Sequence, residues 1–402
     1  MEIEEAIKLL TDAAAPVTET MTVPLFDAYG RIAANDMISE EPVPAFDRSA
    51  MDGYAVCSGE VERASEDMPV SLKVSGELSA GDPTDLRYTP GSAVRVMTGA
   101  MIPEGYDTVV KQEDTDYGED EVKIYASSVK QRNICLAGEE IAPDSCVIKS
   151  GQRIGRAETG LIAALGKDEV CVRRPPRIAL ISTGSELAEA GQPLRYGQIY
   201  NTIRYILGTS LRQQRLEVCL EVTCSDDAGL IEDRLKDALK AADVVITTGG
   251  VSVGKKDLIP AVLDSVGAKK LFSRVNIQPG TPTIGSALDG KVILSLSGNP
   301  YAAMANFDLY FWPVISKLMG SDSYLPSESM AVLSDRYDKV NRMRRLVRAY
   351  TKDGKVFLPA AEHMSSVFGN TSSCNCYIDI PAGQSLSPGD RVRVRNMYPY
   401  PV

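Results

Sequence analysis

The chain has 402 residues, of which 44% are hydrophobic and 24% charged, and its formal net charge is −11. This length exceeds what one hydrophobic core usually serves, so we expect two to four domains. The acidic balance argues against a general nucleic-acid binder, and neither a membrane-spanning apolar run nor a signal-peptide start is evident. The eight scattered cysteines and the single histidine, His363, form no zinc-binding pattern, which favours reduced thiols in the cytoplasm.

The first part of the chain predicts a helical segment, a small β unit and a linker. Residues 2–14 carry apolar side chains at helical spacing, and a second helix is expected at 156–165, ending at Gly166. Short alternating stretches separated by Gly and Pro turns predict an all-β unit between about 54 and 135. The run 173–176 contains two consecutive prolines and indicates a linker.

Beyond this linker, apolar strands alternate with helices. We expect strands at 177–182, 216–223, 243–248 and 291–297, and helices at 199–214, 228–242, 257–267 and from about 300. This alternation is typical of a doubly wound, mostly parallel α/β sheet. The last seventy or so residues predict a small β domain, in which an Asp-Gly turn at 353–354 closes a hairpin.

Three glycine-containing loops follow strands of the predicted sheet, at Ser182–Glu186, Thr247–Gly254 and Ser295–Pro300. Ligands of open parallel sheets bind at the carboxyl ends of the strands, where glycine lets backbone N–H groups approach an anion and helix N-termini favour negative charge. Tight strand-to-helix turns are the alternative, but three such loops on one edge, each with a hydroxyl, favour an anion site. Neither a Walker loop nor a GxGxxG pattern is present, which disfavours ATP hydrolysis and hydride transfer. The candidate binding residues are Ser182, Thr183, Gly184, Gly249, Gly250, Ser252, Gly254, Ser297, Gly298, Asn299 and Pro300.

Five carboxylates also lie in predicted loops: Asp52, Glu140, Glu186, Asp226 and Asp257. Each of them alone is most simply a solvated surface residue. Beside anion-binding loops, however, they indicate a divalent cation such as Mg²⁺ that bridges carboxylates and phosphates.

Seven motifs occur in one order along the chain: PAFDRSAMDGYAV, VMTGAMIPEGYDTVVKQE, STGSEL, GQIYNT, TTGGVSVGKKD, QPGTP and LSGNP. Any one of them would be a weak signal. Their succession and spacing resemble the molybdopterin molybdenumtransferases, the family of MoeA and of the gephyrin E domain, over nearly the whole chain.

This resemblance implies four domains and an elongated homodimer whose active site lies in a cleft between the subunits. The bounds that we assign are 1–53 with 136–176 for an N-terminal helical linker domain, 54–135 for an inserted β domain, 177–326 for the molybdopterin-binding α/β domain, and 327–402 for a C-terminal β-barrel-like domain.

The resemblance also implies an activity. Family members insert molybdate into adenylylated molybdopterin and release AMP with the help of a divalent cation, so both substrates and Mg²⁺ are expected here. Transient contact with other molybdenum-cofactor proteins is expected, and contact with membrane or nucleic acid is not. The matching catalytic residues are Asp52, Thr98, Glu186, Asp226 and Asp257, of which Asp52 and Glu186, with Glu140, are expected to hold the metal. Arg274, Thr281, Arg348 and Ser365 match positions that bind substrate.

One departure from the family pattern concerns charge. The family's PGKP loop, which helps to hold the oxyanion, is Gln278-Pro279-Gly280-Thr281-Pro282 here, without its two lysines. Each lost cation weakens anion binding by about 1–3 kcal/mol if its charge-assisted hydrogen bonds are not replaced. Arg274 retains one positive charge upstream, and Thr281 offers a hydroxyl.

Five other positions also differ from the family pattern: Cys135 stands for arginine, Glu140 for aspartate, Asn201 for aspartate, Ile203 for asparagine and Ser297 for proline. Three functions are therefore compared: molybdenum insertion, a paralogue that binds or delivers molybdopterin or handles another oxyanion such as tungstate, and a gephyrin-like scaffold. Retention of Asp52, Thr98, Glu186, Asp226 and Asp257 favours the enzyme.

Overall fold

The computed structural model describes residues 1–251, 258–359 and 366–397. Its contacts divide the chain into two compact units. The first unit comprises Met1–Asn35, Ser150–Thr159 and Glu169–Val402, and the second comprises Asp36–Lys149 and Gly160–Asp168. No helix among the described residues is long and apolar enough to cross a membrane.

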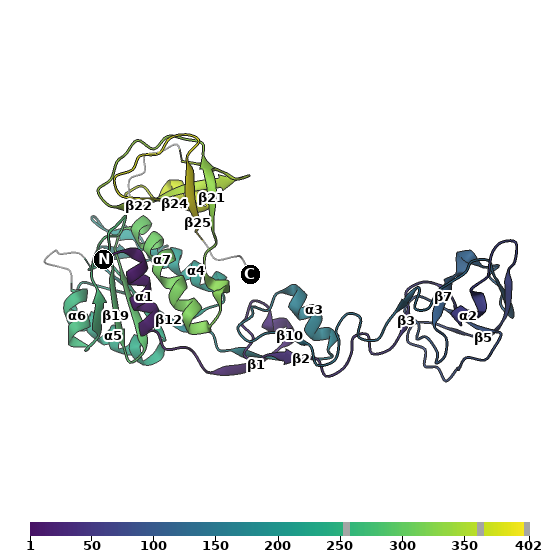
Figure 1. Cartoon of the computed structure of the whole chain (residues 1–402). Coiled ribbons are helices and arrows are strands. Elements are labelled where there is room, and N and C mark those ends of the chain that lie inside the picture. Colours follow the sequence, from purple (N-terminus) through teal and green to yellow (C-terminus); the bar gives the residue numbers. More distant parts are fainter. Residues whose placement is uncertain (252–257, 360–365, 398–402) are drawn as a thin grey trace. The chain divides into compact units, whose positions relative to one another are not determined.

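A six-stranded sheet forms the centre of the first unit (Figure 1). Its strand order is β15 (Glu217–Cys224), β12 (Arg177–Thr183), β16 (Val244–Thr248), β20 (Lys291–Leu296), β19 (Ile284–Leu288) and β17 (Lys269–Phe272). The first four strands are parallel, as the sequence predicts, and the last two pairings are antiparallel because β19 runs in the opposite direction to the other five strands. The doubly wound α/β fold is therefore confirmed, with an antiparallel edge that the sequence analysis did not identify.

Helices cover both faces of this sheet. On one face lie α1 (Ile3–Ala13), α4 (Thr202–Gln213) and α7 (Pro300–Met319), and on the other α5 (Ala228–Ala241) and α6 (Ile259–Ser265). The inner parallel strands β12, β16 and β20 are largely apolar because alternate side chains enter opposite cores: Leu180 packs with the first set and Ile181 with the second.

The end of the chain forms a closed β-barrel. Strands β22 (Arg344–Lys352), β23 (Lys355–Phe357), β21 (Glu328–Leu333), β25 (Arg391–Asn396) and β24 (Cys376–Ile380) pair in that order, and β24 pairs again with β22. The antiparallel pairing of β22 with β23 confirms the hairpin that the Asp-Gly turn predicts. A short strand of the preceding domain, β18 (Ile277–Gln278), adds to β22 in parallel.

The barrel packs against α7 through two buried tyrosines. The Tyr301 hydroxyl donates to the Leu346 carbonyl at 3.0 Å, and the Tyr377 hydroxyl donates to Asp308 Oδ2 at 2.7 Å. Asp308 lies within the helix and also accepts from Trp312 Nε1 at 3.3 Å. Burial raises the pKa of Asp308 to about 8, against the opposing effect of the bonds from Tyr377 and Trp312.

The first unit also contains smaller elements near the linker. Strands β1 (Thr20–Pro24) and β11 (Glu169–Arg173) pair antiparallel, and helix α3 (Arg156–Ala164) begins in this unit.

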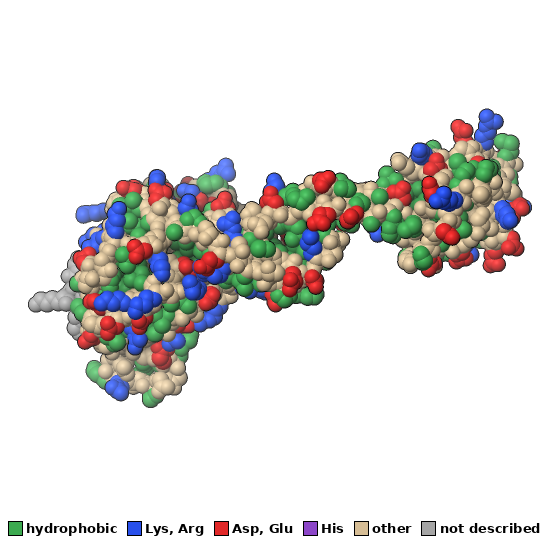
Figure 2. Space-filling model, turned by 90° about the horizontal axis from the view of Figure 1, so that it is seen from below, with side chains coloured by type: hydrophobic (Ala, Val, Ile, Leu, Met, Phe, Trp, Pro, Cys, Tyr) green, Lys and Arg blue, Asp and Glu red, His purple; other side chains and the backbone are tan. Residues whose placement is uncertain are grey.

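On the face that Figure 2 shows, acidic and basic side chains are interspersed. This face carries no broad basic patch of the kind that nucleic-acid backbones require, as far as its described residues go.

The second unit is built on a five-stranded sheet. Its order is β7 (Thr108–Lys111), β4 (Gly53–Val56), β6 (Ser92–Val96), β5 (Val70–Leu78) and β8 (Glu121–Ile124). Two short ladders, β2 (Met37–Ile38) with β10 (Cys146–Ile148) and β3 (Arg48–Ser49) with β9 (Ile134–Cys135), and the one-turn helix α2 (Ser58–Val61) accompany it. The β character predicted for 54–135 agrees with these strands.

Candidate active site

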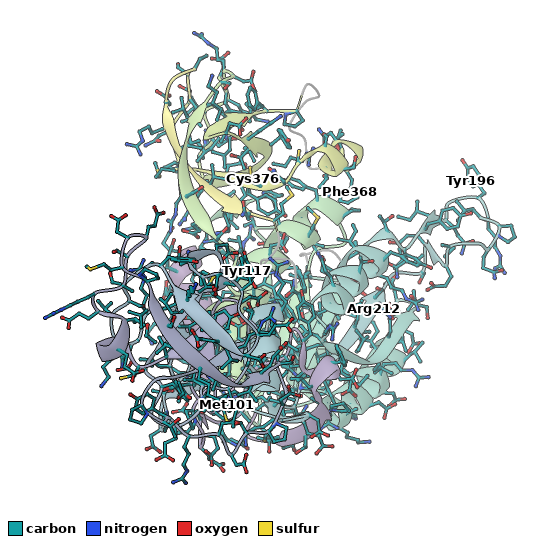
Figure 3. The ribbon with its side chains drawn as sticks, turned by 90° about the vertical axis from the view of Figure 1, so that its right-hand side faces the viewer. Met101, Tyr117, Tyr196, Arg212, Phe368 and Cys376 are labelled. Carbon is teal, nitrogen blue, oxygen red and sulfur yellow. The ribbon has the colours of Figure 1, made fainter. Side chains whose placement is uncertain are left out.

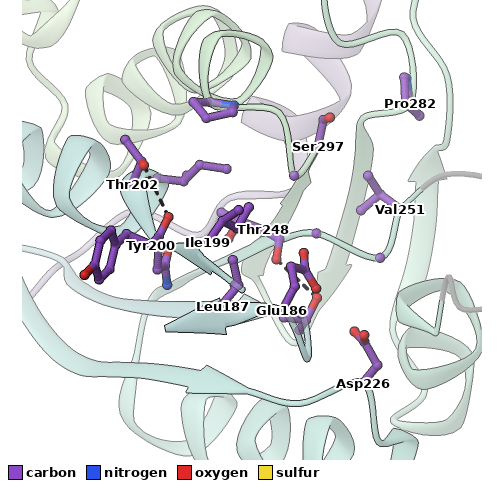
Figure 4. Close-up of a pocket in the computed structure, with 18 residues that line it drawn as sticks. Glu186, Leu187, Ile199, Tyr200, Thr202, Asp226, Thr248, Val251, Pro282 and Ser297 are labelled. Atoms are coloured by element: carbon purple, nitrogen blue, oxygen red, sulfur yellow. Dashed lines mark hydrogen bonds between the residues drawn. The ribbon is translucent and has the colours of Figure 1, made fainter. Parts of the chain in front are cut away.

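A cavity of about 560 Å³ opens at the carboxyl ends of the parallel strands. We call it the sheet-edge cavity (Figure 4). Its volume lies in the range of small-molecule sites. All three glycine-containing loops singled out in the sequence contribute to it. The lining residues are Thr183, Gly184, Glu186, Leu187, Ile199, Tyr200, Asn201, Thr202, Ile203, Asp226, Thr248, Gly249, Gly250, Val251, Pro282, Ser297, Gly298 and Pro300.

Two carboxylates from neighbouring strands border this cavity. Glu186 follows β12 and Asp226 follows β15, and both side chains are visible at the cavity in Figure 4. Asp226 is fixed by a reciprocal pair: its Oδ2 accepts from the Ser185 N–H at 3.1 Å, and its own N–H donates to Ser185 Oγ at 3.0 Å. Two carboxylates in one cavity provide the hard oxygen ligands that Mg²⁺ prefers.

The second loop requires glycine at Gly249. Its φ is +91°, and a β-carbon there would lie 2.3 Å from the Thr183 carbonyl oxygen of the neighbouring strand. The Gly249 N–H donates to the Leu296 carbonyl at 3.0 Å, so the loop closes against the strand ends on both sides. This close approach keeps the floor of the cavity free of side chains, which an anion-binding loop requires.

The third loop opens helix α7. Asn299 is its N-cap, with Oδ1 accepting from the Ala302 N–H at 3.0 Å, and Ser297 Oγ accepts from the Asn299 N–H at 3.2 Å. A β-carbon at Gly298 would meet nothing closer than Gly249 Cα at 3.6 Å, which is ordinary contact. Gly298 is therefore a position where a methyl group fits the protein and changes only the cavity.

An arm of the α/β domain forms a further wall, which the sequence analysis did not include. The arm runs from β13 (Leu187–Ala188) to β14 (Ile199–Tyr200), and Tyr196 lies at its tip (Figure 3). The Tyr200 hydroxyl donates to the Gln192 carbonyl at 3.0 Å, and Asn201 caps α4. The GQIYNT motif was the available signal, but its side chains could be assigned to the cavity only once β14 was placed.

A second cavity, of about 490 Å³, lies beside the QPGTP loop, and we call it the QPGTP cavity. It shares Pro282 and Ser297 with the sheet-edge cavity. Two cations of the C-terminal domain, Lys339 and Arg345, belong to its wall. Neither cation could be assigned to the loop from the sequence, because both lie far from it along the chain. The lining residues are Gln278, Pro279, Gly280, Thr281, Pro282, Ser297, Asn299, Tyr301, Ala302, Lys339, Arg345 and Ser366.

The QPGTP loop is anchored to α7 and to its own strand. Asn306 Nδ2 donates to the Pro279 carbonyl at 3.0 Å, and a β-carbon at Gly280 would lie 1.7 Å from this nitrogen. The Thr281 hydroxyl donates to the Ile277 carbonyl at 2.7 Å. That bond uses the single hydroxyl hydrogen of Thr281, so this side chain is not a donor to an anion in the cavity.

Other predicted substrate-binding residues lie elsewhere or are not described. Arg274 is exposed and lines neither cavity, and Ser182 is fully buried below the loops. Arg348 is 1% exposed and packs over the Tyr301 ring, 4.1 Å from its centroid. The remaining expected residues lie outside the described part of the chain: Ser252, Gly254, Asp257 and Ser365.

In the second unit, Asp52 and Thr98 lie together. Asp52 directly precedes β4 and Thr98 comes soon after β6, and these two strands are paired. Asp52 Oδ1 accepts from both the Thr98 hydroxyl and the Thr98 N–H at 2.7 Å. These two bonds, the hydroxyl first, hold the pKa of the Asp52 carboxyl below its usual value. Glu140 is exposed in its turn. Within the described residues, no three His, Cys, Asp or Glu side chains are grouped to hold a metal ion.

Three family models match successive parts of the chain. Residues 1–166 match the MoeA N-terminal region (domains I and II), 179–317 a probable molybdopterin-binding domain, and 330–396 the MoeA C-terminal region (domain IV). A molybdopterin molybdenumtransferase of Staphylococcus epidermidis is 34% identical over 386 residues, covering 95% of this chain and 92% of the relative. The Staphylococcus aureus protein of the same name is 34% identical over 384 residues, with 95% and 91% coverage. A molybdopterin biosynthesis MoeA protein from Pyrococcus horikoshii has a TM-score of 0.86 at 28% identity and covers 99% of both chains.

Proposed function

The chain belongs to the MoeA family of molybdenum-cofactor biosynthesis proteins, and on that premise we propose that it inserts molybdate into adenylylated molybdopterin and releases AMP. It is an enzyme of this pathway, related over almost its full length to molybdopterin molybdenumtransferases. A paralogue that only binds molybdopterin, or that handles tungstate instead, is not favoured by these relationships.

One observation supports the location of the chemistry: three strand-end loops and two carboxylates meet at the sheet-edge cavity. The glycine loops offer backbone N–H groups and space for a phosphate, and Glu186 and Asp226 offer carboxylate oxygens beside it. We therefore propose that this cavity binds the phosphate-bearing part of the pterin substrate.

The same residues fit a Mg²⁺ ion. Mg²⁺ keeps several waters and is usually held by one or two carboxylates together with substrate phosphates, so a preformed group of three ligands is not required. Among the described residues, Glu186 and Asp226 are the carboxylates that line the sheet-edge cavity. When bound, the ion supplies positive charge to the phosphate as the bond to AMP breaks. The protein's own part is to hold Asp226 through Ser185 and to position the ligand by the glycine loops.

We keep Asp52 and Thr98 as proposed catalytic residues and a homodimer as the proposed assembly, both on the family relationship. Asp52 is held ionised by the two bonds from Thr98, which suits a metal ligand or a charge-stabilising group. The four-domain division given above also remains a proposal.

The test is AMP release by the purified chain with adenylylated molybdopterin, Mg²⁺ and molybdate. We expect Asp52→Asn to lower the rate about 10²- to 10³-fold, the loss typical of removing a group that stabilises developing charge. Pterin affinity should stay within a few-fold, because a metal ligand affects charge stabilisation more than ground-state contacts. Asp67→Asn, an exposed carboxylate of the same unit, is the matched control. An active Asp52→Asn variant would remove Asp52 from the mechanism.

A further inference from the structure

The charged side chains that line the QPGTP cavity are all positive, among the residues that the structure describes. Lys339 and Arg345 line it, and no Asp or Glu occurs among its described lining residues. Both cations come from the C-terminal domain, whereas the loop itself contributes Gln278 and Thr281, which are neutral. The cavity therefore suits a small anion although the whole chain is acidic.

Arg345 is held at a defined position relative to the loop. Strands β18 and β22 pair in parallel, with Gln278 directly opposite Arg345. The Arg345 side chain is buried, since the residue is 9% exposed, and its Nη1 donates to Asn341 Oδ1 at 3.0 Å. A charge at residue 345 thus lies one strand away from residue 278 at the same level of the sheet.

The other cations near this strand have different contacts. Arg344 donates to Asp379 and, at 2.7 Å, to Glu4 Oε1, and Asp379 is the main cause of its raised pKa. Arg344 is therefore neutralised by two carboxylates. Lys339, in the segment that leads into β22, lines the cavity and is solvent-exposed. The structure thus distinguishes, among several cations of 339–348, the two that line the cavity.

Ser297 adds a neutral donor at the boundary with the sheet-edge cavity. Its oxygen accepts from the Asn299 N–H, so its own hydrogen is oriented away from that bond and can donate to a ligand. A buried guanidinium, an ammonium and a hydroxyl in one cavity match the needs of a compact oxyanion, because charge-assisted bonds from cations are the strongest available to it.

We propose that Lys339 and Arg345 bind the oxyanion substrate in the QPGTP cavity and provide, from the C-terminal barrel, the positive charge that the QPGTP loop lacks. This inference rests on the proposed function for the identity of the anion, molybdate. It replaces the expectation that the loss of two loop lysines leaves the site poor in cations.

Equilibrium dialysis of molybdate against the full chain, without pterin, tests the proposal directly. We expect Lys339→Gln to weaken molybdate binding about tenfold, equivalent to about 1.4 kcal/mol. Lys352→Gln, at the exposed end of β22, removes the same charge from the same domain and should leave affinity within twofold. The difference between the two variants should shrink at high salt, since the Lys339 charge is exposed.

A charge exchange across the strand pair sharpens the test. Arg345→Gln should weaken binding at least tenfold, and adding Gln278→Lys in the same chain should restore most of the affinity, because residues 278 and 345 are paired. Thermal unfolding verifies that each variant is folded; if Arg345→Gln is not, Lys339→Gln still decides. Unchanged molybdate affinity in Lys339→Gln overturns the proposal, as does a wild-type chain that binds no molybdate. A wild-type chain that binds molybdate but releases no AMP leaves this inference intact and contradicts the proposed function.

Discussion

The two cavities of the first unit differ in the sign of their charged groups. The sheet-edge cavity has two carboxylates and no Lys or Arg among its described lining residues, whereas the QPGTP cavity has two cations and no carboxylate among those described. An acidic site with backbone donors suits a phosphate that arrives with a divalent cation, and a cationic site suits a bare oxyanion. The opposite charges of the two cavities therefore favour binding of the phosphate with its cation in the first cavity and of the oxyanion in the second.

The cavities also differ in how the chain builds them. The sheet-edge cavity comes from loops that directly follow β12, β15, β16 and β20, together with the neighbouring arm. The QPGTP cavity joins a loop of the α/β domain to the barrel strand β22. Changes in one domain should thus affect the first cavity, whereas the second depends on how two domains dock. The following variants test this contrast.

The largest effect should come from Glu186→Gln in the sheet-edge cavity. We expect AMP release to fall about 10²- to 10³-fold, because a carboxylate that holds the cation is lost. Molybdate affinity without pterin should stay within about twofold, since Glu186 does not line the QPGTP cavity. Lys339→Gln should show the opposite pattern: molybdate affinity falls about tenfold, whereas AMP release at saturating molybdate changes little. If Glu186→Gln weakens molybdate binding as much as turnover, the two cavities do not act separately.

A smaller effect is expected from Gly298→Ala. The added methyl group meets Gly249 Cα at 3.6 Å, an ordinary contact, so the protein should keep its stability while the cavity loses space. Pterin affinity should fall about tenfold, or about 1.4 kcal/mol, and molybdate affinity should not change. Titration of the pterin with each variant measures this. Undiminished pterin affinity would mean that the third loop is only a turn.

The smallest effect should be that of Asp308→Asn, which alters the docking of the barrel. Burial raises the pKa of Asp308 to about 8 from its ordinary 3.8, so the folded chain binds this proton more tightly than the unfolded chain. The stability that this proton confers is complete below pH of about 4 and is lost as the pH rises toward 8. Asparagine carries no such proton. The unfolding temperature of the variant should therefore rise relative to that of the wild type between pH 5 and pH 8, by about 2–4 °C for each kcal/mol of unfolding free energy that the wild type loses. Parallel pH profiles for the two proteins would contradict the raised pKa.

Much of the fold follows from local patterns in the sequence. The parallel strands are short apolar runs, and Asp227 and Asn299 stand as N-caps of α5 and α7. These signals depend on residues close together in the chain. Strands β17 and β19 were missed because they are short and their pairing is antiparallel at an otherwise parallel edge. Such pairing is decided by the sheet, not by the segment.

The two cavities show the same limit at the level of side chains. The residues around Glu186 and Gly249 could be named from motifs, because each motif occupies one loop. Arg345 could not, because its relation to Gln278 exists only through the register of β18 and β22. Arg274 was the cation that the sequence predicted for this group, but it lies on the surface and lines neither cavity. Arg274 is only four residues from Gln278 in the chain, yet it does not share its cavity.

Pro282 and Ser297 line both cavities, so these two residues lie between them. A ligand that shifts either residue on one side alters the wall of the other cavity. The two binding equilibria are then thermodynamically linked. If bound pterin changes the affinity for the oxyanion by some factor, bound oxyanion changes the affinity for the pterin by the same factor. Ser297, whose oxygen accepts from the Asn299 N–H, and Pro282 are the two described residues that any such link has in common.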